Sequence, residues 1–431
     1  MRSQYININI SIGTINPIGT TMTHVNAQKV FHLLYSDMQA AFGSCGALNL
    51  TPTIDPFDSR VNSRQLPLPA GMRQGSDNSN DFFPDEIQHH ILNEPGVAIT
   101  YTFSVGNRKV VLHFVEFNTR TQPSNHHPEF DAHAKRVCAL MHLVSMHASR
   151  PTCSSALSIY IYMTEFKKLF PTKKGEVIDT EHANTGMSYH CTRTNDVVVY
   201  RKEEWFKVLI HELFHAMGLS FIESDMPKGV DQAMQDMLRK MYSISHPVRI
   251  YETYCEIWAR ILNVVFDCFV DTDANPVYGT SNTSTEFHVF MECVLEGLDE
   301  YARFAQHQCA KLLRYADISH DIIATPTEKN RTIVAEKYRE NTNVFAYYVL
   351  THILLHSPTV FMTWCYRNNR LTKTDNNGIM QFRTIPANFN GFMELLHHCK
   401  QQCPQLDSSV LNDEHVLGSS MRMTPRSHLQ V

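Results

Sequence analysis

The chain has 431 residues, which is enough for two substantial lobes with sizeable cores, and 43% of its residues are hydrophobic, as in an ordinary globular protein. Its formal net charge of -5 at pH 7 argues against a general nucleic-acid-binding protein. The eleven cysteines are scattered without a C-x-x-C pair, and no charged segment followed by an apolar run opens the chain, so we expect free buried thiols and a cytoplasmic protein without a secretory signal.

The first 85 residues are predicted to be irregular apart from one helix. Residues 5–10 alternate Ile with Asn and could form an edge strand, and residues 25–42 have the apolar spacing of an amphipathic helix. Residues 51–85 are rich in Pro, Ser, Asn and Asp, which is typical of a long loop or linker.

Residues 86–220 are predicted to form a mixed α/β lobe. Gly106 and Asn107 are a suitable two-residue hairpin turn between its first two strands. The predicted elements are, in chain order, strands at 97–105 and 108–117, a helix at 128–147, a strand at 157–163, an extended segment at 182–191, a strand at 197–200 and a final helix.

The final helix of this lobe carries a metal-binding motif. Within NDVVVYRKEEWFKVLIHELFHAMGLSF, residues 195–221, the pattern H-E-x-x-H is formed by His211, Glu212 and His215. On a helix this spacing places both imidazoles on one face, one turn apart, where they can bind zinc with Glu212 beside them as a general base for a zinc-activated water. The apolar spacing around the motif predicts a buried helix that ends near Gly218.

The second half of the chain is predicted to be almost entirely helical. Its expected helices span residues 231–242, 250–270, 286–315, 343–356 and 390–402. Residues 221–403 would form a helical lobe, and the polar tail at 404–431 is expected to be flexible. The longest apolar stretch, residues 344–365, is interrupted by histidines and a proline, so a membrane span is not expected.

A zinc site of this kind needs a third protein ligand, and several side chains qualify by position. Glu252 and Glu256 lie at i and i+4 of the helical stretch IYETYCEIWARILN and therefore share one face. These two carboxylates could instead lie on a solvated helix face and pair with Arg249 and Arg260, but the rest of that helix is mostly apolar, where unpaired carboxylates are costly. Glu223, Asp225 and His246 lie in nearby loops and are alternatives.

Together, H-E-x-x-H and the later E-x-x-x-E resemble the gluzincin branch of the zincin metallopeptidases, in which the second pattern is E-x-x-x-D/E. The resemblance implies that Glu252 is the third zinc ligand and that Glu256 accepts the free N–H of a zinc-bound histidine. The related metzincin pattern matches through Gly218, but Phe221 stands at its ligand position and cannot bind zinc.

The resemblance also implies an α+β, zincin-like fold, in which a mixed α/β upper lobe and a mostly helical lower lobe enclose the zinc site in a cleft. Gluzincins commonly supply a Tyr or His from the helical lobe to stabilise the oxyanion. The candidates here are Tyr347 and Tyr348 in the segment TNVFAYYVL, followed by His246 and Tyr254.

The predicted function is zinc-dependent hydrolysis of peptide bonds in a peptide or protein substrate, with Glu212 as general base. Many zincins bind their substrate as an added strand, here along residues 184–188 or 197–200, although residues 184–186 could instead form only a turn. The alternative is a catalytically idle zincin fold that serves as a structural or interaction protein. Neither a nucleic acid nor a membrane is expected as a partner.

The segments EEWFKVLIHELFHAMGL, ETYCEIWARI and TNVFAYYVL together also look like zincin-like proteins of large nucleocytoplasmic DNA viruses. This second resemblance implies a viral protein that works in the cytoplasm of the infected host cell or travels in the virion. Free thiols and the lack of a secretory signal would suit both locations.

Overall fold

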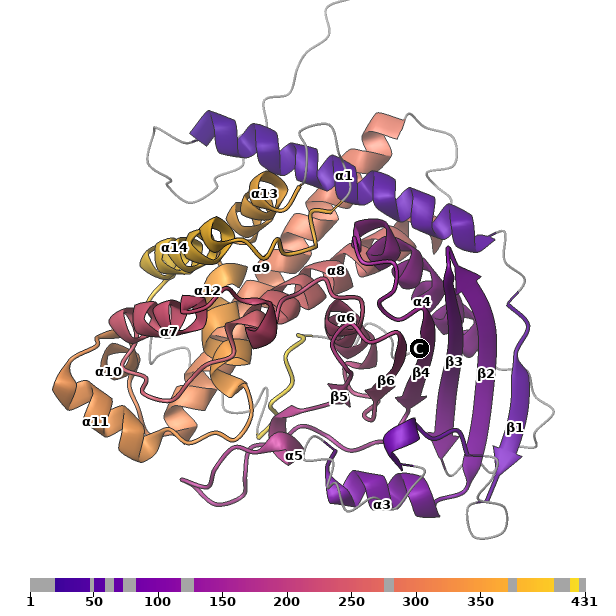
Figure 1. Ribbon diagram of the computed structural model, residues 1–431, viewed down its shortest axis with the longest axis horizontal. Coiled ribbons are helices and arrows are strands. Elements are labelled where there is room, and N and C mark those ends of the chain that lie inside the picture. The colour runs from indigo at the N-terminus through magenta and orange to yellow at the C-terminus, as the bar shows by residue number, and fades with distance from the viewer. Residues whose placement is uncertain are drawn as a thin grey trace, which may run out of the picture.

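The computed structural model describes residues 20–46, 50–58, 66–72, 83–117, 128–274, 283–370, 378–406 and 419–425. The described chain combines one mixed sheet with many helices, which confirms the predicted α+β class (Figure 1). Helices α6 (Trp205–Ala216) and α8 (Ile250–Ala274) lie between the sheet on one side of the molecule and the C-terminal helices on the other (Figure 1). The edge strand predicted at residues 5–10 lies outside the described residues.

The sheet has six strands in the order β1-β2-β3-β4-β6-β5. Their bounds are Thr53–Phe57 for β1, Gly96–Val105 for β2, Arg108–Phe117 for β3, Ala156–Tyr162 for β4, Gly186–Met187 for β5 and Thr194–Val199 for β6. The strands β3, β4 and β6 are parallel, whereas β1, β2 and β5 pair antiparallel with their neighbours. The predicted hairpin is confirmed, with Gly106 at a φ of 57°. The loop predicted over residues 51–85 is wrong at its start, where β1 forms.

Helices cover both faces of the sheet, because its inner strands have apolar side chains on both sides. On β3, Phe114 faces the core shared with α6 and with α4 (Pro128–His147), whereas Val115 faces a smaller core shared with α3 (Asp85–Asn93). The long N-terminal helix α1 (Thr20–Gly46) packs against α4. Residues 25–42 and 128–147 are therefore helical, as predicted.

The second half is helical, also as predicted, and packs against the same core. Besides α8, its elements are η2 (Glu223–Asp225), α7 (Val230–Met241), α9 (Thr283–Tyr315), α10 (His320–Ala324), α11 (Glu328–Lys337), the π-helix η4 (Phe345–Leu350), α12 (Thr351–Leu355), α13 (Pro358–Asn368) and α14 (Pro386–Gln402). Helices α10, α11 and α13 are not predicted from the sequence. One apolar core runs from α1 and the sheet through α8 to α14. None of the described helices is both long and apolar enough to cross a membrane.

Four of the cysteines are paired, which corrects the expectation of free thiols. Disulfides join Cys153 to Cys191 and Cys268 to Cys293, and the other seven cysteines are free. Disulfides are rare in cytosolic proteins, so the cysteines no longer argue for a reducing compartment.

The segment 419–425 packs against the core, although a flexible tail is predicted from residue 404. Met421 and Met423 are buried, and the backbone N–H of Met423 donates to Glu204 Oε1 at 2.6 Å. The burial of two flexible thioether side chains favours this packing. The segment thus lies beside the start of α6, where Glu204 caps the helix in a left-handed conformation.

Candidate metal centre

Helix α6 carries the H-E-x-x-H residues inside the protein. It follows β6 and packs between the sheet and α8, so nearly all of its side chains are buried. It ends at Ala216, near Gly218 as predicted, because a φ of 67° at Gly218 allows a Schellman arrangement of the last carbonyl groups. The Leu219 N–H donates to Phe214 O at 2.9 Å, and the Gly218 N–H donates to His215 O at 3.0 Å.

The Nε2 atoms of His211 and His215 and the Oε2 atom of Glu252 converge on one point. The two nitrogen atoms are 3.3 Å apart, and Glu252 Oε2 lies 3.0 Å from His211 Nε2 and 3.4 Å from His215 Nε2. A tetrahedral zinc ion, about 2.0–2.2 Å from each nitrogen and oxygen, separates its ligands by about 3.3–3.6 Å. The three side chains therefore fit a metal ion with little movement.

The hydrogen bonds of His211 explain why this triangle requires a cation. Its Nδ1 atom lies 3.1 Å from Glu256 Oε2, and since an ionised carboxylate only accepts hydrogen bonds, Nδ1 carries a proton. In the neutral imidazole the lone pair of Nε2 then faces the Glu252 carboxylate at 3.0 Å. Two acceptors this close repel each other unless a proton or a metal ion lies between them.

In the metal-free protein, protons take this role. Burial opposes a charge on His211, but its hydrogen bonds to Glu252 and Glu256 outweigh burial and raise the pKa of His211 to about 10. Burial also disfavours the charged form of Glu252, yet the charge on His215 and the hydrogen bonds of both imidazoles hold the pKa of Glu252 well below its usual range. A metal ion that binds here would release protons, because its imidazole ligands must be neutral.

Glu256 is kept ionised by two buried cations. Lys207 Nζ lies 3.0 Å and Arg260 Nε lies 2.8 Å from Glu256 Oε1. Burial raises the pKa of Glu256, but these two charges outweigh burial and hold the pKa well below its usual range. Lys207 lies one turn before His211 and Arg260 one turn after Glu256, so the i, i+4 spacing was the signal available in the sequence. Glu256 thus occupies the supporting position that the resemblance implies.

Glu212 lies next to the imidazoles in sequence, and Ser188 fixes its carboxylate. The Ser188 hydroxyl donates to Glu212 Oε2 at 2.7 Å from the segment that follows the edge strand β5. Strand β5 approaches α6 closely at Gly186, where a Cβ atom would lie 2.8 Å from Val198 O and 3.1 Å from Glu212 Cγ. Glycine is therefore needed at this position. Ser188 is predicted from the sequence to lie in a substrate-binding segment, but its contact with Glu212 is not predicted.

The structure brings Tyr347 to the centre and turns Tyr348 away from it. The Tyr347 hydroxyl donates to Glu252 Oε2 at 3.1 Å, and its ring centroid lies 5.7 Å from that of His211. The Tyr348 hydroxyl donates to the backbone carbonyl of Met421 instead. Adjacent residues of a helix point in different directions, so only one of the two tyrosines can reach the ligands.

The other side chains considered from the sequence have different partners. Glu223 pairs with Arg249 at 3.8 Å, Asp225 with His190 at 3.3 Å, and His246 with Glu340 at 3.0 Å. Tyr254 donates to the backbone carbonyl of Met380, and Phe221 is buried among aromatic rings. Among the described residues, Glu252 is therefore the carboxylate that joins both imidazoles in one group of potential ligands.

The described residues also form a cleft of about 1890 Å³. Residues from α3, from α5 (Thr180–Ala183), from the segment before α8 and from 340–343 line this cleft. The three ligands do not line it, but Asn343 does, and Asn343 Nδ2 donates to the Tyr347 hydroxyl at 3.4 Å. Asn343 and Tyr347 therefore connect the lining of the cleft to Glu252 through two hydrogen bonds.

Comparison of the chain with models of known protein families, with characterised proteins and with solved structures finds no match. The zincin resemblance therefore stays a prediction from the sequence. The arrangement of His211, His215 and Glu252 shows a group that could hold a metal ion, whatever the ancestry of the chain.

Proposed function

We propose that this chain is a zinc-dependent peptidase of the gluzincin type, which hydrolyses peptide bonds in a polypeptide substrate. The observation that carries the proposal is the convergence of His211, His215 and Glu252 at separations of 3.0 to 3.4 Å, with Glu212 in the same helical turn. Two imidazoles and one carboxylate are a ligand set of catalytic zinc sites, which keep a fourth position open. The buried contact between Glu256 and His211 supports the proposal, because zinc ligands commonly have such carboxylate partners.

A zinc ion held by these residues would activate the attacking water and, as a Lewis acid, polarise the peptide carbonyl. Glu212 accepts the proton of the attacking water and passes it to the leaving amine. Ser188 keeps the Glu212 carboxylate in one orientation through its 2.7 Å hydrogen bond. Glu256 keeps the proton of His211 on Nδ1, so that Nε2 is free to act as a ligand.

Tyr347 is the proposed donor to the oxyanion that forms during the attack. Its hydroxyl lies at the ligand triangle, 3.1 Å from Glu252, and a small rotation would direct it to a carbonyl oxygen bound there. Its backbone is fixed by Arg260, which donates to the Tyr347 carbonyl at 2.9 Å. Tyr348 takes no part in this proposal, because its hydroxyl bonds to backbone elsewhere.

The substrate would bind beside the edge strand β5 and extend into the cleft. An edge strand offers backbone groups to which an extended peptide can add. Eight Asp and Glu residues line the cleft, against three Lys and Arg residues. This balance favours peptides with basic side chains, and the preference should weaken as salt concentration rises.

The test is a comparison of Glu212→Gln with wild type, both loaded with zinc, on a mixed library of peptides. We expect Glu212→Gln to keep its zinc and to lose about 10²–10⁴-fold in kcat, as the removal of a general base usually does. Glu165→Gln is the matched control, because that carboxylate is 75% exposed and belongs to no potential ligand group in the described part of the chain.

Wild type that binds zinc and cleaves no peptide in the library would contradict the proposal. It would favour the idle zincin fold instead. Unchanged hydrolysis by Glu212→Gln would refute the role of Glu212 as general base.

A further inference from the structure

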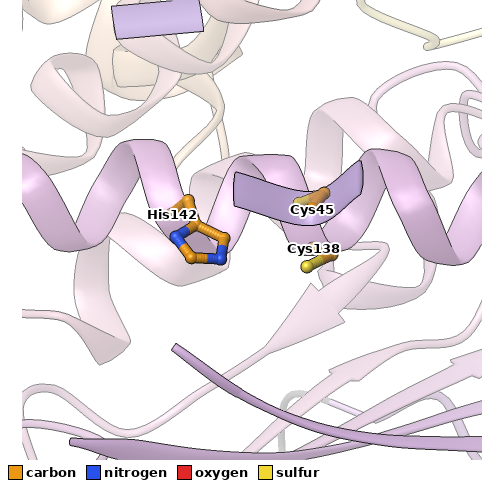
Figure 2. A group of neighbouring side chains, drawn as sticks. All are labelled: Cys45, Cys138 and His142. Atoms are coloured by element: carbon orange, nitrogen blue, oxygen red, sulfur yellow. The ribbon is translucent and has the colours of Figure 1, made fainter. Parts of the chain in front are cut away.

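Two cysteines and a histidine meet where α1 crosses α4, far from H-E-x-x-H in the sequence. Cys45 lies in the last turn of α1, while Cys138 and His142 lie one helical turn apart on α4. Figure 2 shows Cys45 next to Cys138. His142 lies further along α4, the helix that carries Cys138. The ligand atoms of all three side chains lie within 4.8 Å of one another.

The two thiols are buried, adjacent and not joined to each other. Cys45 is 4% and Cys138 0% exposed, and both are free, whereas Cys153 and Cys191 form a disulfide. A zinc ion at about 2.3 Å from sulfur and about 2.0–2.1 Å from nitrogen separates such ligands by about 3.3–3.8 Å. Rotamer adjustments that close the triangle by about 1 Å would therefore give this spacing.

A metal ion would satisfy a buried ring nitrogen of this group and bind its two thiols. The buried Nε2 atom of His142 has no hydrogen-bond partner among the described residues. The Cys45 thiol and the Cys138 thiol form a hydrogen bond with each other. Two adjacent buried thiolates would repel each other, and a divalent cation removes this repulsion because it binds thiolates directly.

We propose that Cys45, Cys138 and His142 bind a second zinc ion, which fastens the last turn of α1 to α4. Two soft thiolate ligands and one imidazole suit zinc, and water would complete a tetrahedral site. The role is structural, since this group lies at a helix crossing, and it does not depend on the proposed peptidase activity.

The experiment measures zinc bound per chain after the full-length protein is purified under reducing conditions, loaded with Zn²⁺ and desalted. We expect Cys45→Ser and Cys138→Ser each to bind one zinc ion fewer than wild type. Cys309→Ser is the matched control, because this buried free thiol belongs to no potential ligand group among the described residues, and it should bind as much zinc as wild type. Circular dichroism of each variant shows whether it is folded.

Loading with Co²⁺ distinguishes this site from the H-E-x-x-H centre. Thiolate ligands give cobalt a charge-transfer absorption band in the near ultraviolet, which a centre with two imidazoles and one carboxylate does not have. The band should persist in His215→Ala, which removes the other centre, and should disappear when Cys138→Ser is added.

Two results would overturn the inference. One is an unchanged zinc content and an unchanged cobalt band in folded Cys138→Ser and Cys45→Ser. The other is a disulfide between Cys45 and Cys138 in protein purified without reductant that persists after Zn²⁺ is added with a mild thiol.

Discussion

Replacement of Glu256 by Gln would keep the shape of the side chain but remove the charge that three neighbours share. Glu256 is 2% exposed and lies 3.0 Å from Lys207, 2.8 Å from Arg260 and 3.1 Å from His211. Breaking a buried ion pair typically costs about 3–5 kcal/mol, because the remaining charge stays buried without a partner. We expect Glu256→Gln to lower the free energy of unfolding of the metal-free protein by this amount. Zinc affinity should fall about 10–100-fold, because His211 loses its carboxylate partner.

Two assays separate these effects. Urea unfolding in the presence of a chelator measures the stability of the metal-free protein, and competition with a chromophoric chelator measures zinc affinity. Addition of Lys207→Met to Glu256→Gln removes one of the two stranded cations and should recover part of the lost stability. The reasoning is refuted if Glu256→Gln is within about 1 kcal/mol of wild type, or if the double variant is less stable than the single one.

Three further predictions concern other parts of the molecule. Tyr347→Phe should lower kcat about 10²–10³-fold with little loss of zinc. Tyr348→Phe should leave kcat unchanged and lower the free energy of unfolding by about 1 kcal/mol. Equal effects of the two variants on kcat would exclude Tyr347 as the oxyanion donor. Gly218→Ala should lower the free energy of unfolding by about 1–2 kcal/mol for the left-handed backbone and by more for its new Cβ atom, 3.3 Å from both sulfur atoms of the neighbouring disulfide. Gly175→Ala, at a φ of 84° with open space around it, should lose less in the same unfolding assay, and an equal loss would disprove the contact argument. Burial lowers the pKa of His133 from 6.5 to about 4, so the unfolded chain takes up a proton in this pH window that the folded chain does not. The free energy of unfolding should therefore fall as pH drops from about 6.5 to about 4, and His133 contributes at most about 1.4 kcal/mol per pH unit to this fall. His133→Phe should reduce the slope, which urea unfolding at several pH values measures. An unchanged slope would contradict this role of His133.

The parts of the centre that follow from local spacing could be predicted from the sequence. The interval between His211 and His215 matches one helical turn, and so does the interval between Glu252 and Glu256, so each pair shares a helix face. The apolar residues around both motifs predict that the two helices are buried. Their packing against each other was supplied by the family resemblance alone, and the structure shows it directly in the contact between α6 and α8.

The remaining contacts depend on how distant segments meet, which no local pattern encodes. Ser188 reaches Glu212 only because β5 approaches α6 at Gly186. The choice between Tyr347 and Tyr348 depends on the rotation of a π-helix against α8. Cys45 and Cys138 are 93 positions apart in the sequence and meet only because α1 crosses α4.

Strand β1 and the buried part of the C-terminal tail were not predicted, for local reasons. Strand β1 has the sequence TIDPF, whose proline argues against a strand unless it lies at a sheet edge, where β1 in fact lies. The tail from residue 404 is polar overall, and this composition masks Met421 and Met423, which the structure buries.

The most direct test of the proposed centre is a crystal structure of the zinc-loaded protein with anomalous diffraction at the zinc absorption edge. We predict a zinc peak about 2.0–2.2 Å from His211 Nε2, His215 Nε2 and a Glu252 carboxylate oxygen. No peak between these three atoms, or a zinc ion there that Glu252 does not bind, would contradict the proposed zinc centre.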